Sequence, residues 1–154
     1  MFTDKVIVKQ VALTVDTNAY SANDVIGGRL TFAVPSPSNS GILQWLKITD
    51  ADNEGAALDV YIFNSAPTAI ADDAAAAFAI ADLDKLITKV EIAAADYEAV
   101  NSLKFVIKDE GSEGMNRAYQ TDADGNLYAY VVCTGTPTWT AATDLKMTLG
   151  VLTS

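Results

Sequence analysis

Apolar and polar residues alternate along most of this chain, so that every second residue is apolar. Three segments show the alternation most clearly: residues 29–34, 103–108 and 145–151. A period of two predicts a β-strand with one buried and one exposed face. In the second segment we expect the apolar residues Leu103, Phe105 and Ile107 to face a core and the two lysines to face solvent.

Other runs are apolar on both faces of an extended backbone. They are residues 6–15, 42–49, 57–63, 89–93 and 126–135. Such runs are expected of central strands and of strands whose outer face meets a partner. Clusters of Gly, Pro, Asn, Asp and Ser separate the runs at 34–41, 50–55, 108–114 and 121–126. The whole pattern predicts eight strands.

The segment 71–88 lacks the alternation and is rich in alanine. Its helix propensity predicts one or two short helices in a crossover, with Asp72 or Asp73 as a first cap and Asp82 as a second. An ordered loop is the alternative, because a short helix depends on packing for its stability. We therefore predict an all-β fold: an antiparallel β-sandwich of jelly-roll or Greek-key type, as a single jelly-roll-like domain over residues 1–154.

The composition removes most forms of side-chain catalysis. Histidine is absent, which excludes Ser-His-Asp and Cys-His arrangements. The single cysteine, Cys133, has no partner for an internal disulfide and is interpreted as a core thiol. The acidic pairs Asp72 with Asp73, Asp82 with Asp84 and Asp109 with Glu110 are interpreted as turns and helix starts. We therefore predict no enzyme activity, no catalytic residues and no cofactor.

Acidic residues outnumber basic residues twofold. The chain has 20 Asp and Glu against 10 Lys and Arg, which gives a formal charge of -10 and a pI near 4.2. Such a chain repels polyanions, so we expect neither nucleic acid nor an anionic membrane as a partner. Residues 1–17 lack the apolar core of a signal peptide, and no segment approaches the roughly 20 apolar residues of a membrane span. We therefore expect synthesis in a cytoplasm, followed either by retention there or by export without a signal peptide.

Two acidic loops have part of the spacing of a calcium-binding loop. The first contains Asp50, Asp52, Glu54 and Gly55, and the second contains Asp122, Asp124 and Asn126. The first has Tyr61 where a bidentate glutamate is needed, and the Asp-Gly pair of the second is a hairpin signal. We favour solvated turns over metal sites in both loops.

Four aromatic residues are candidates for a carbohydrate platform or an interface anchor if they are exposed. They are Trp45, Tyr128, Tyr130 and Trp139. Trp139 lies in a threonine-rich loop before the last strand. For this residue we favour a side chain folded back over the end of the sandwich.

The stretch NAYSANDVIGGRLTF, residues 18–32, combines Asp24 with the pair Gly27-Gly28. The pair has no phosphate-loop spacing, no following helix and no lysine to meet a phosphate. Asp24 is placed to accept hydrogen bonds in a turn, and the glycines suit a bulge or a close backbone crossing. The stretch therefore predicts a corner of the scaffold.

Four stretches in this order resemble small virion proteins of tailed bacteriophages: AYSANDVIGGRLTF, SGILQWLKITD, LDVYIFNSAPTAIADDAAAAFAIADLDKLI and NLYAYVVCTGTPTWTAATDLKMTLGVL. The resemblance runs from residue 20 to residue 149. It matches at Tyr20, Asp24, Gly27, Gly28, Pro67, Asp82 and Leu127. These positions look like fold-defining residues, so the resemblance implies structural and not catalytic roles for them.

The phage proteins that this chain resembles look like jelly-roll head cement or decoration proteins, which trimerise on the outside of icosahedral capsids. The resemblance implies a non-enzymatic structural protein on the outer surface of the virion, made in the host cytoplasm. Its partners would be the major capsid protein and itself, as a homotrimer. The apolar strands at 57–63 and 126–133 would supply these contacts. A carbohydrate- or receptor-binding virion module, in a head fibre or the tail, is the alternative.

Overall fold

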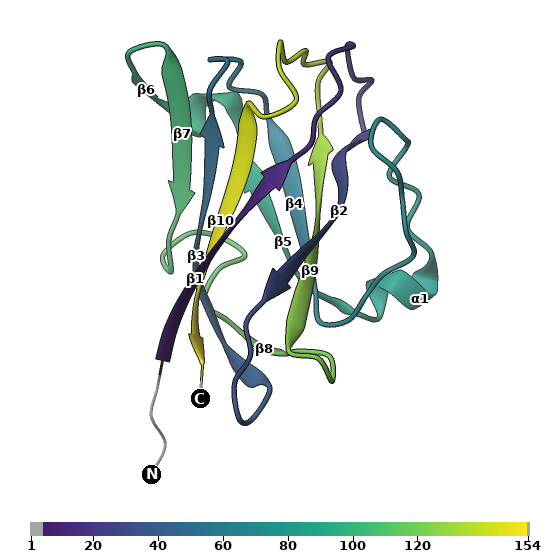
Figure 1. Ribbon diagram of the computed structural model, residues 1–154, viewed down its shortest axis with the longest axis vertical. Coiled ribbons are helices and arrows are strands. Elements are labelled where there is room, and N and C mark those ends of the chain that lie inside the picture. The colour runs from purple at the N-terminus through teal and green to yellow at the C-terminus, as the bar shows by residue number, and fades with distance from the viewer. Residues whose placement is uncertain (1–4, 154) are drawn as a thin grey trace.

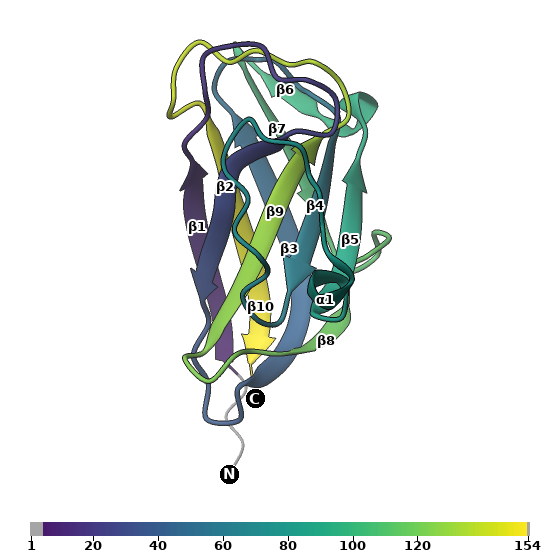
Figure 2. The same ribbon diagram turned by 90° about the vertical axis from the view of Figure 1, so that its right-hand side faces the viewer.

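The computed structural model describes residues 5–153, which form two antiparallel β-sheets stacked face to face (Figure 1, Figure 2). The strands are β1 (Lys5–Leu13), β2 (Val25–Ala33), β3 (Ser40–Asp50), β4 (Leu58–Phe63), β5 (Leu86–Ile92), β6 (Glu98–Val100), β7 (Leu103–Lys108), β8 (Arg117–Gln120), β9 (Asn126–Cys133) and β10 (Leu145–Thr153). The helices are α1 (Ile80–Leu83) and the 3-10 helix η1 (Ala94–Asp96). Within residues 5–153, no helix has the length and hydropathy needed to cross a bilayer.

The strands are ordered as in a jelly roll. The β1 sheet has the order β1-β10-β3-β7-β6, with β8 also paired to β3, and the β2 sheet has the order β2-β9-β4-β5. The pairs are nested: β1 with β10, β2 with β9, β3 with β7 and β8, and β4 with β5. A long antiparallel ribbon folded over on itself produces this nesting. The predicted antiparallel sandwich and its eight strands are confirmed, and the short strands β6 and β8 were not predicted.

The core fills the space between the two sheets. Its largest fully buried side chains include Trp139, Tyr20 and Phe32. The apolar rows predicted in residues 29–34 and 145–151 both face this core. Alternation therefore identified the inner face of β2 and of β10 correctly.

The faces predicted for β7 are wrong. Val106 faces the core with 3% of its surface exposed, whereas Leu103 and Ile107 are 45% and 53% exposed on the outer side. The lysines lie on the inner side at the margin of the core, where Lys108 Nζ is 2.7 Å from Asp96 Oδ2. A shift of the strand register by one residue moves every side chain of a strand to the other face of the sheet. Because β7 has apolar residues on both faces, its sequence pattern does not fix which face turns inward.

β2 begins with the predicted corner. Gly27 and Gly28 have φ of +75° and +69°, and the pairing of β2 with β9 shifts register across them. A Cβ at Gly27 would lie 2.8 Å from Leu13 Cβ, so β1 crosses close to this backbone. Asp24 accepts the backbone N–H of Ser21 at 2.8 Å, which closes the turn before the strand. The bulge and the turn role of Asp24 are therefore confirmed.

Asp72 ties this corner to the segment that follows β4. Its Oδ1 accepts the backbone N–H of Gly27 at 2.6 Å and the hydroxyl of Tyr20 at 2.8 Å. The Tyr20 oxygen in turn accepts the backbone N–H of Asp16 at 2.6 Å. Burial is the main cause that raises the pKa of Tyr20, so its hydroxyl keeps the proton that it donates. Tyr20, Gly27 and Asp72 thus hold this part of the scaffold together.

The crossover, residues 64–85, contains a single turn of helix. Residues 71–79 form turns and extended backbone, so the loop alternative describes most of this segment. The predicted first helix cap is wrong, because Asp72 binds the corner and Asp73 has φ of +57°. Asp82 is the third residue of α1 and not its N-cap residue, but its side chain accepts the N–H of the N-cap residue Ala79 at 3.3 Å. The segment lies along the β2 sheet and packs onto it, and this packing outweighs the helix propensity of its alanines.

The crossover covers the outer face of the β2 sheet (Figure 2). The buried residues Val25, Phe63, Tyr130 and Val132 pack there against Ile70, Ala76 and Phe78 of the crossover. The Tyr130 hydroxyl donates to the Thr68 carbonyl at 2.6 Å and accepts the Ile70 N–H at 2.9 Å. The crossover therefore covers part of the outer faces of β4 and β9 and leaves Tyr61 and Tyr128 half-buried there. That these strands supply trimer and capsid contacts stays a prediction.

Asp82 anchors the crossover, and we expect this anchor to depend on pH. The backbone N–H of Thr68, at 2.8 Å, is the main cause that lowers the pKa of Asp82, and the Thr68 hydroxyl and Ala79 N–H add to it. A lowered pKa stabilises the fold above about pH 4, the value for an unfolded aspartate, and this contribution is lost as the pH falls through the folded pKa. Asp82→Asn should therefore be less stable than the wild type at about pH 6, with a smaller difference at about pH 3. Urea unfolding at both values tests this, and an equal difference at both contradicts it.

Candidate functional site

The first acidic loop is closed by hydrogen bonds to its own backbone. Asp50, which is buried, accepts the N–H groups of Asp52 and Gly55 at 2.9 and 2.8 Å. Asp52 reaches the loop before β10, where it accepts the N–H and the hydroxyl of Thr140 at 3.0 and 2.8 Å. Both carboxylates therefore point at backbone and hydroxyl donors. Across residues 5–153, no three Asp, Glu or Cys side chains converge in a way that would hold a metal ion.

The second acidic loop is a corner and not the predicted hairpin, because it joins β8 in one sheet to β9 in the other. Asp122 accepts the N–H groups of Asp124 and Asn126 at 3.1 and 2.8 Å and the hydroxyl of Tyr128 at 2.7 Å. Burial raises the pKa of Asp122, but these hydrogen bonds outweigh it, and the pKa is lowered. This carboxylate serves as a structural acceptor.

The remaining candidates for chemistry are held in structural contacts. Cys133 is buried and its thiol lies 3.1 Å from the Ser21 carbonyl, and burial raises its pKa. A buried thiol with a raised pKa is a poor nucleophile. Asp109 accepts the Gly111 N–H within its own turn at 3.1 Å. The interpretation of Cys133 as a core thiol is confirmed.

The structure separates the four aromatic candidates. Trp139 and Tyr130 are fully buried, and Trp139 makes an edge contact with Tyr20 at 5.5 Å between ring centroids. The favoured interpretation of Trp139, folded back over the sandwich end, is confirmed. Tyr128 is half-buried with its hydroxyl on Asp122. Trp45 is half-buried on the outer side of the β1 sheet, where it takes part in a larger surface.

The outer side of the β1 sheet carries most of the exposed apolar side chains. Among residues 5–153, eight large apolar side chains are exposed, and six of them belong to this sheet: Val6, Val8, Ile42, Val100, Leu103 and Ile107. No segment of the described chain covers this side, in contrast to the crossover on the β2 sheet (Figure 1). Large exposed apolar areas mark interaction sites in proteins.

Cross-strand pairing joins these side chains into a band. Val8 on β1 lies opposite Gly150 on β10, which lies opposite Trp45 on β3. In the next row, Leu152 of β10 has Val6 and Ile42 on its two sides. Residues directly opposite each other in antiparallel strands share a face, so the band is continuous across three strands.

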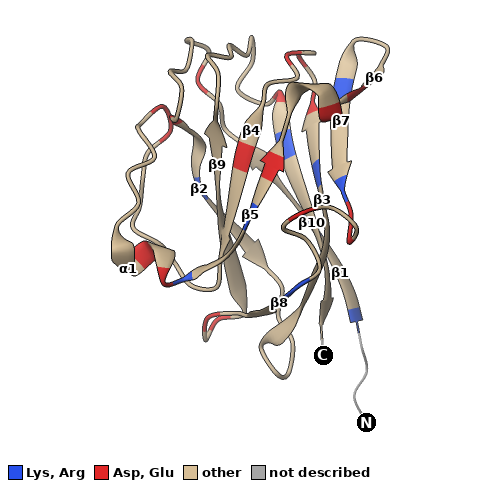
Figure 3. Cartoon of the chain, turned by 180° about the vertical axis from the view of Figure 1, so that it is seen from behind, with Lys and Arg blue, Asp and Glu red and all other residues tan. Residues whose placement is uncertain are grey.

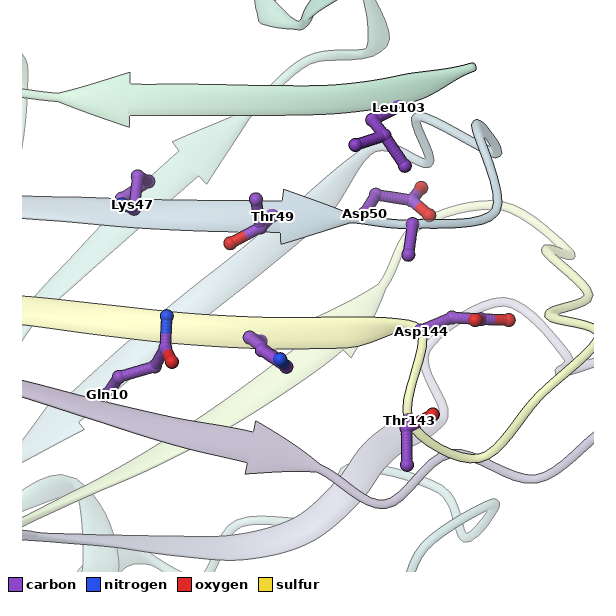
Figure 4. Close-up of a pocket in the computed structure, with 9 residues that line it drawn as sticks. Gln10, Lys47, Thr49, Asp50, Leu103, Thr143 and Asp144 are labelled. Carbon is purple, nitrogen blue, oxygen red and sulfur yellow. The ribbon is translucent and has the colours of Figure 1, made fainter. Parts of the chain in front are cut away.

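Two lysines lie on the same side as the band. Lys47 is opposite Thr148 and Ile107, and Lys146 is opposite Thr49. Neither lysine makes an ion pair within residues 5–153, where the pairs involve Lys85, Lys89 and Lys108. Lys47 and Lys146 line a shallow hollow of about 240 Å³ together with Gln10, Thr49, Asp50, Ala51, Leu103, Thr143 and Asp144 (Figure 4).

Charge is distributed unevenly between the two sheets (Figure 3). Seven of the ten basic residues lie on strands of the β1 sheet: Lys5, Lys9, Lys47, Lys104, Lys108, Arg117 and Lys146. The same strands carry two acidic residues, the buried Asp50 and the edge residue Glu98. The β1 sheet is therefore basic in a protein that is acidic as a whole. Sequence reasoning missed this surface because it depends on which strands become neighbours.

We expect Gly150→Ala to displace Trp45. A Cβ at Gly150 would overlap the Trp45 indole, which lies directly over this glycine. Because Trp45 is at the surface, its ring can move aside, and the cost in stability should be only about 1 kcal/mol. Acrylamide quenching of fluorescence should increase, since Trp139 is buried and Trp45 carries the accessible emission. Unchanged quenching would contradict the stacked arrangement, and Trp45→Phe serves as the control for the assignment of the emission.

No protein-family model matches the sequence, and no curated protein matches it. Among solved structures, tomato aspermy virus is similar over 97% of this chain and 76% of its own, with 7% identity and a TM-score of 0.44. The clostridial cysteine protease Cwp84 matches over 93% with 10% identity and a TM-score of 0.35, and a serine protease of Aeromonas sobria over 100% with 11% identity and a TM-score of 0.40. This chain spans 28% of the length of each protease chain. Similarities this weak identify neither a family nor an activity.

Proposed function

We propose that this protein is a non-enzymatic structural component of a tailed-phage virion, a cement or decoration protein that trimerises on the outer surface of the head. The observation that supports the attachment to the head is the uncovered apolar side of the β1 sheet, on a scaffold whose other outer face is packed against its own crossover. The sequence resemblance to phage virion proteins suggests the location on a tailed-phage head and the trimer. Tyr20, Gly27 and Asp82, which match those proteins, act here as structural residues.

A structural role fits the chemistry of the side chains. The candidate carboxylates are hydrogen-bonded to the backbone, as Asp50, Asp82 and Asp122 illustrate. A general acid or base needs a carboxyl group free to meet a substrate. The formal charge of -10 suits the outside of a head better than contact with packaged DNA.

The proposed mechanism is mechanical. A trimer placed at the junctions between capsid subunits adds buried area across those junctions. Because it binds the assembled shell and not the dissociated subunits, it shifts the equilibrium away from rupture. Three linked contacts give avidity even when each contact is weak.

Two measurements test the proposal. The mass in solution should be about three times 16.3 kDa. Heads that lack the protein should rupture at a lower temperature than complete heads. When the ionic strength is lowered, they should rupture under conditions that complete heads still withstand, and adding the purified protein should restore their resistance. Equal resistance of the two kinds of head would show that the protein is not a cement.

The alternative, a carbohydrate- or receptor-binding module, would have few exposed aromatic side chains with which to bind a ligand. Trp139 and Tyr130 are buried, so Trp45 and Tyr128 are the remaining aromatic candidates. Glycan binding that is lost in Trp45→Ala, by a protein that does not bind heads, would favour this alternative.

A further inference from the structure

We propose that the protein docks through the outer side of the β1 sheet onto a different protein whose contact surface is apolar at its centre and carries carboxylates opposite Lys47 and Lys146. This docking surface consists of Val6, Val8, Ile42, Trp45, Lys47 and Lys146. The inference rests on the proposed function and adds to it the face that is used and the chemistry of the partner.

The docking surface has the composition of an interface centre. Val6 and Val8 are 59% and 52% exposed, and Trp45 lies beside them over Gly150. Tryptophan is enriched at the energetically dominant positions of protein interfaces. The fold buries the comparable apolar face of the β2 sheet under the crossover and leaves this one open. Because no segment within residues 5–153 covers the docking surface, we assign its burial to a second molecule.

Charge identifies the kind of partner. The chain has 20 acidic residues, yet the outward positions of β1, β3, β7 and β10 hold none of them, because Asp50 on β3 points inward and is buried. Lys47 and Lys146 are the charged groups at these outward positions, and no carboxylate in residues 5–153 forms an ion pair with either. Acidic side chains lie only at the margins of the surface, Asp144 in the hollow with the lysines and Asp109 and Glu110 beside Trp45. Complementary charges steer association and exclude wrong partners. The partner should therefore carry carboxylates at the positions that meet Lys47 and Lys146.

A second copy of the chain fits this surface poorly. In a face-to-face contact of two copies related by a twofold axis, the outward positions of β1, β3, β7 and β10 would offer no carboxylate to the lysines of the other copy, so these charges would stay unpaired. A head-to-tail contact would use an acidic surface such as that around α1. This helix lies on the other side of the sandwich, over the β2 sheet (Figure 1, Figure 2). Contacts through opposite sides build an open chain of molecules and do not close into a trimer.

Reversal of the two charges tests the inference directly. The probe is purified heads assembled without the protein, mixed with the wild type, with Lys47→Glu/Lys146→Glu, or with the control Lys9→Glu/Arg117→Glu. The control makes the same change in net charge at exposed residues opposite the inward-facing Leu149 and Leu43. The control should bind as the wild type does, and the docking-surface variant should bind at least about tenfold more weakly. Equal binding by the two double variants overturns the inference.

Carbodiimide cross-linking, which joins lysine amines to carboxylates at zero length, identifies the partner. In decorated heads, Lys47 or Lys146 should be joined to an Asp or Glu of a different polypeptide. Cross-links from these lysines to another copy of this chain would overturn the inference in favour of self-association. If the wild type does not bind heads at all, the proposed function fails and the inference fails with it. Thermal melting of each variant alone separates lost binding from lost folding.

Discussion

Replacing Trp139 with alanine is expected to lower the free energy of unfolding by about 3 to 5 kcal/mol, the usual cost of removing a large buried aromatic side chain. Trp139 is fully buried and packs edge-on against Tyr20 at 5.5 Å. Tyr20 in turn donates to Asp72, which holds the corner of β2. The cavity would therefore loosen a structural cluster as well as remove apolar contacts. Urea unfolding followed by far-UV circular dichroism measures the change.

Two further tryptophan variants make this prediction specific. Trp139→Phe should lower the free energy of unfolding much less, because a phenyl ring still fills most of the space. The substitution also removes the indole N–H, which has no hydrogen-bond partner in residues 5–153. Trp45→Ala should change stability by roughly 1 kcal/mol or less, since Trp45 is half-buried at the surface. If Trp45→Ala were the more damaging of the two alanine variants, the assignment of Trp139 to the core would be wrong.

Gly27→Ala should destabilise the protein by roughly 2 to 5 kcal/mol. The left-handed φ of +75° costs a non-glycine residue about 1 to 2 kcal/mol. The new Cβ would also lie 2.8 Å from Leu13 Cβ and 3.0 Å from Leu13 Cα. Relief of that overlap requires β1 and β2 to move apart, and overpacking of this kind costs about 1 to 3 kcal/mol more. Equilibrium unfolding in urea gives the total.

The neighbouring glycine provides a matched control. Gly28 has a similar φ of +69°, but a Cβ there would have its closest neighbour at 3.6 Å. Gly28→Ala should therefore show the backbone cost alone, roughly 1 to 2 kcal/mol. Equal effects of the two variants would mean that the close crossing at Leu13 contributes nothing.

The two outer faces of the sandwich differ in what covers them. On the β2 sheet, Phe78 of the crossover and Tyr130 of β9 are in ring contact at 5.6 Å, so the chain has completed that side. On the β1 sheet, Val8 and Ile107 remain more than half exposed. Under the proposed function, the protein needs at least one side that is uncovered until it meets the shell, and the β1 sheet offers one.

The features that the sequence predicted correctly depend on local patterns of residues. The alternation in 145–151 places its apolar residues in the core because a strand with one polar face has a single favourable orientation. The pair Gly27-Gly28 marks a corner because only glycine adopts positive φ at little cost. Cys133 is a core thiol because it is small and apolar and no base is available to activate it.

Other features depend on which segments become neighbours. Asp82 looked like a helix cap because alanine favours helix, but it binds Thr68, fourteen residues earlier, once the crossover lies on the β2 sheet. The faces of β7 were assigned wrongly because Leu103 and Val106 are both apolar, and the pairing of β7 with β3 determines which one turns inward.

By itself, the sequence determined the strands, the sandwich class, the corner at the start of β2 and the lack of histidine chemistry. Each of these follows from the spacing of particular residues along the chain or from the amino-acid composition. Only the tertiary structure decided that the crossover packs over β4 and β9, while Val6, Val8 and Trp45 stay at the surface beside two lysines that form no ion pair within residues 5–153. The physical reason is that an apolar outer face has the same sequence pattern whether its own chain, a partner or solvent lies over it. Which of these covers it depends on contacts between residues far apart in the chain.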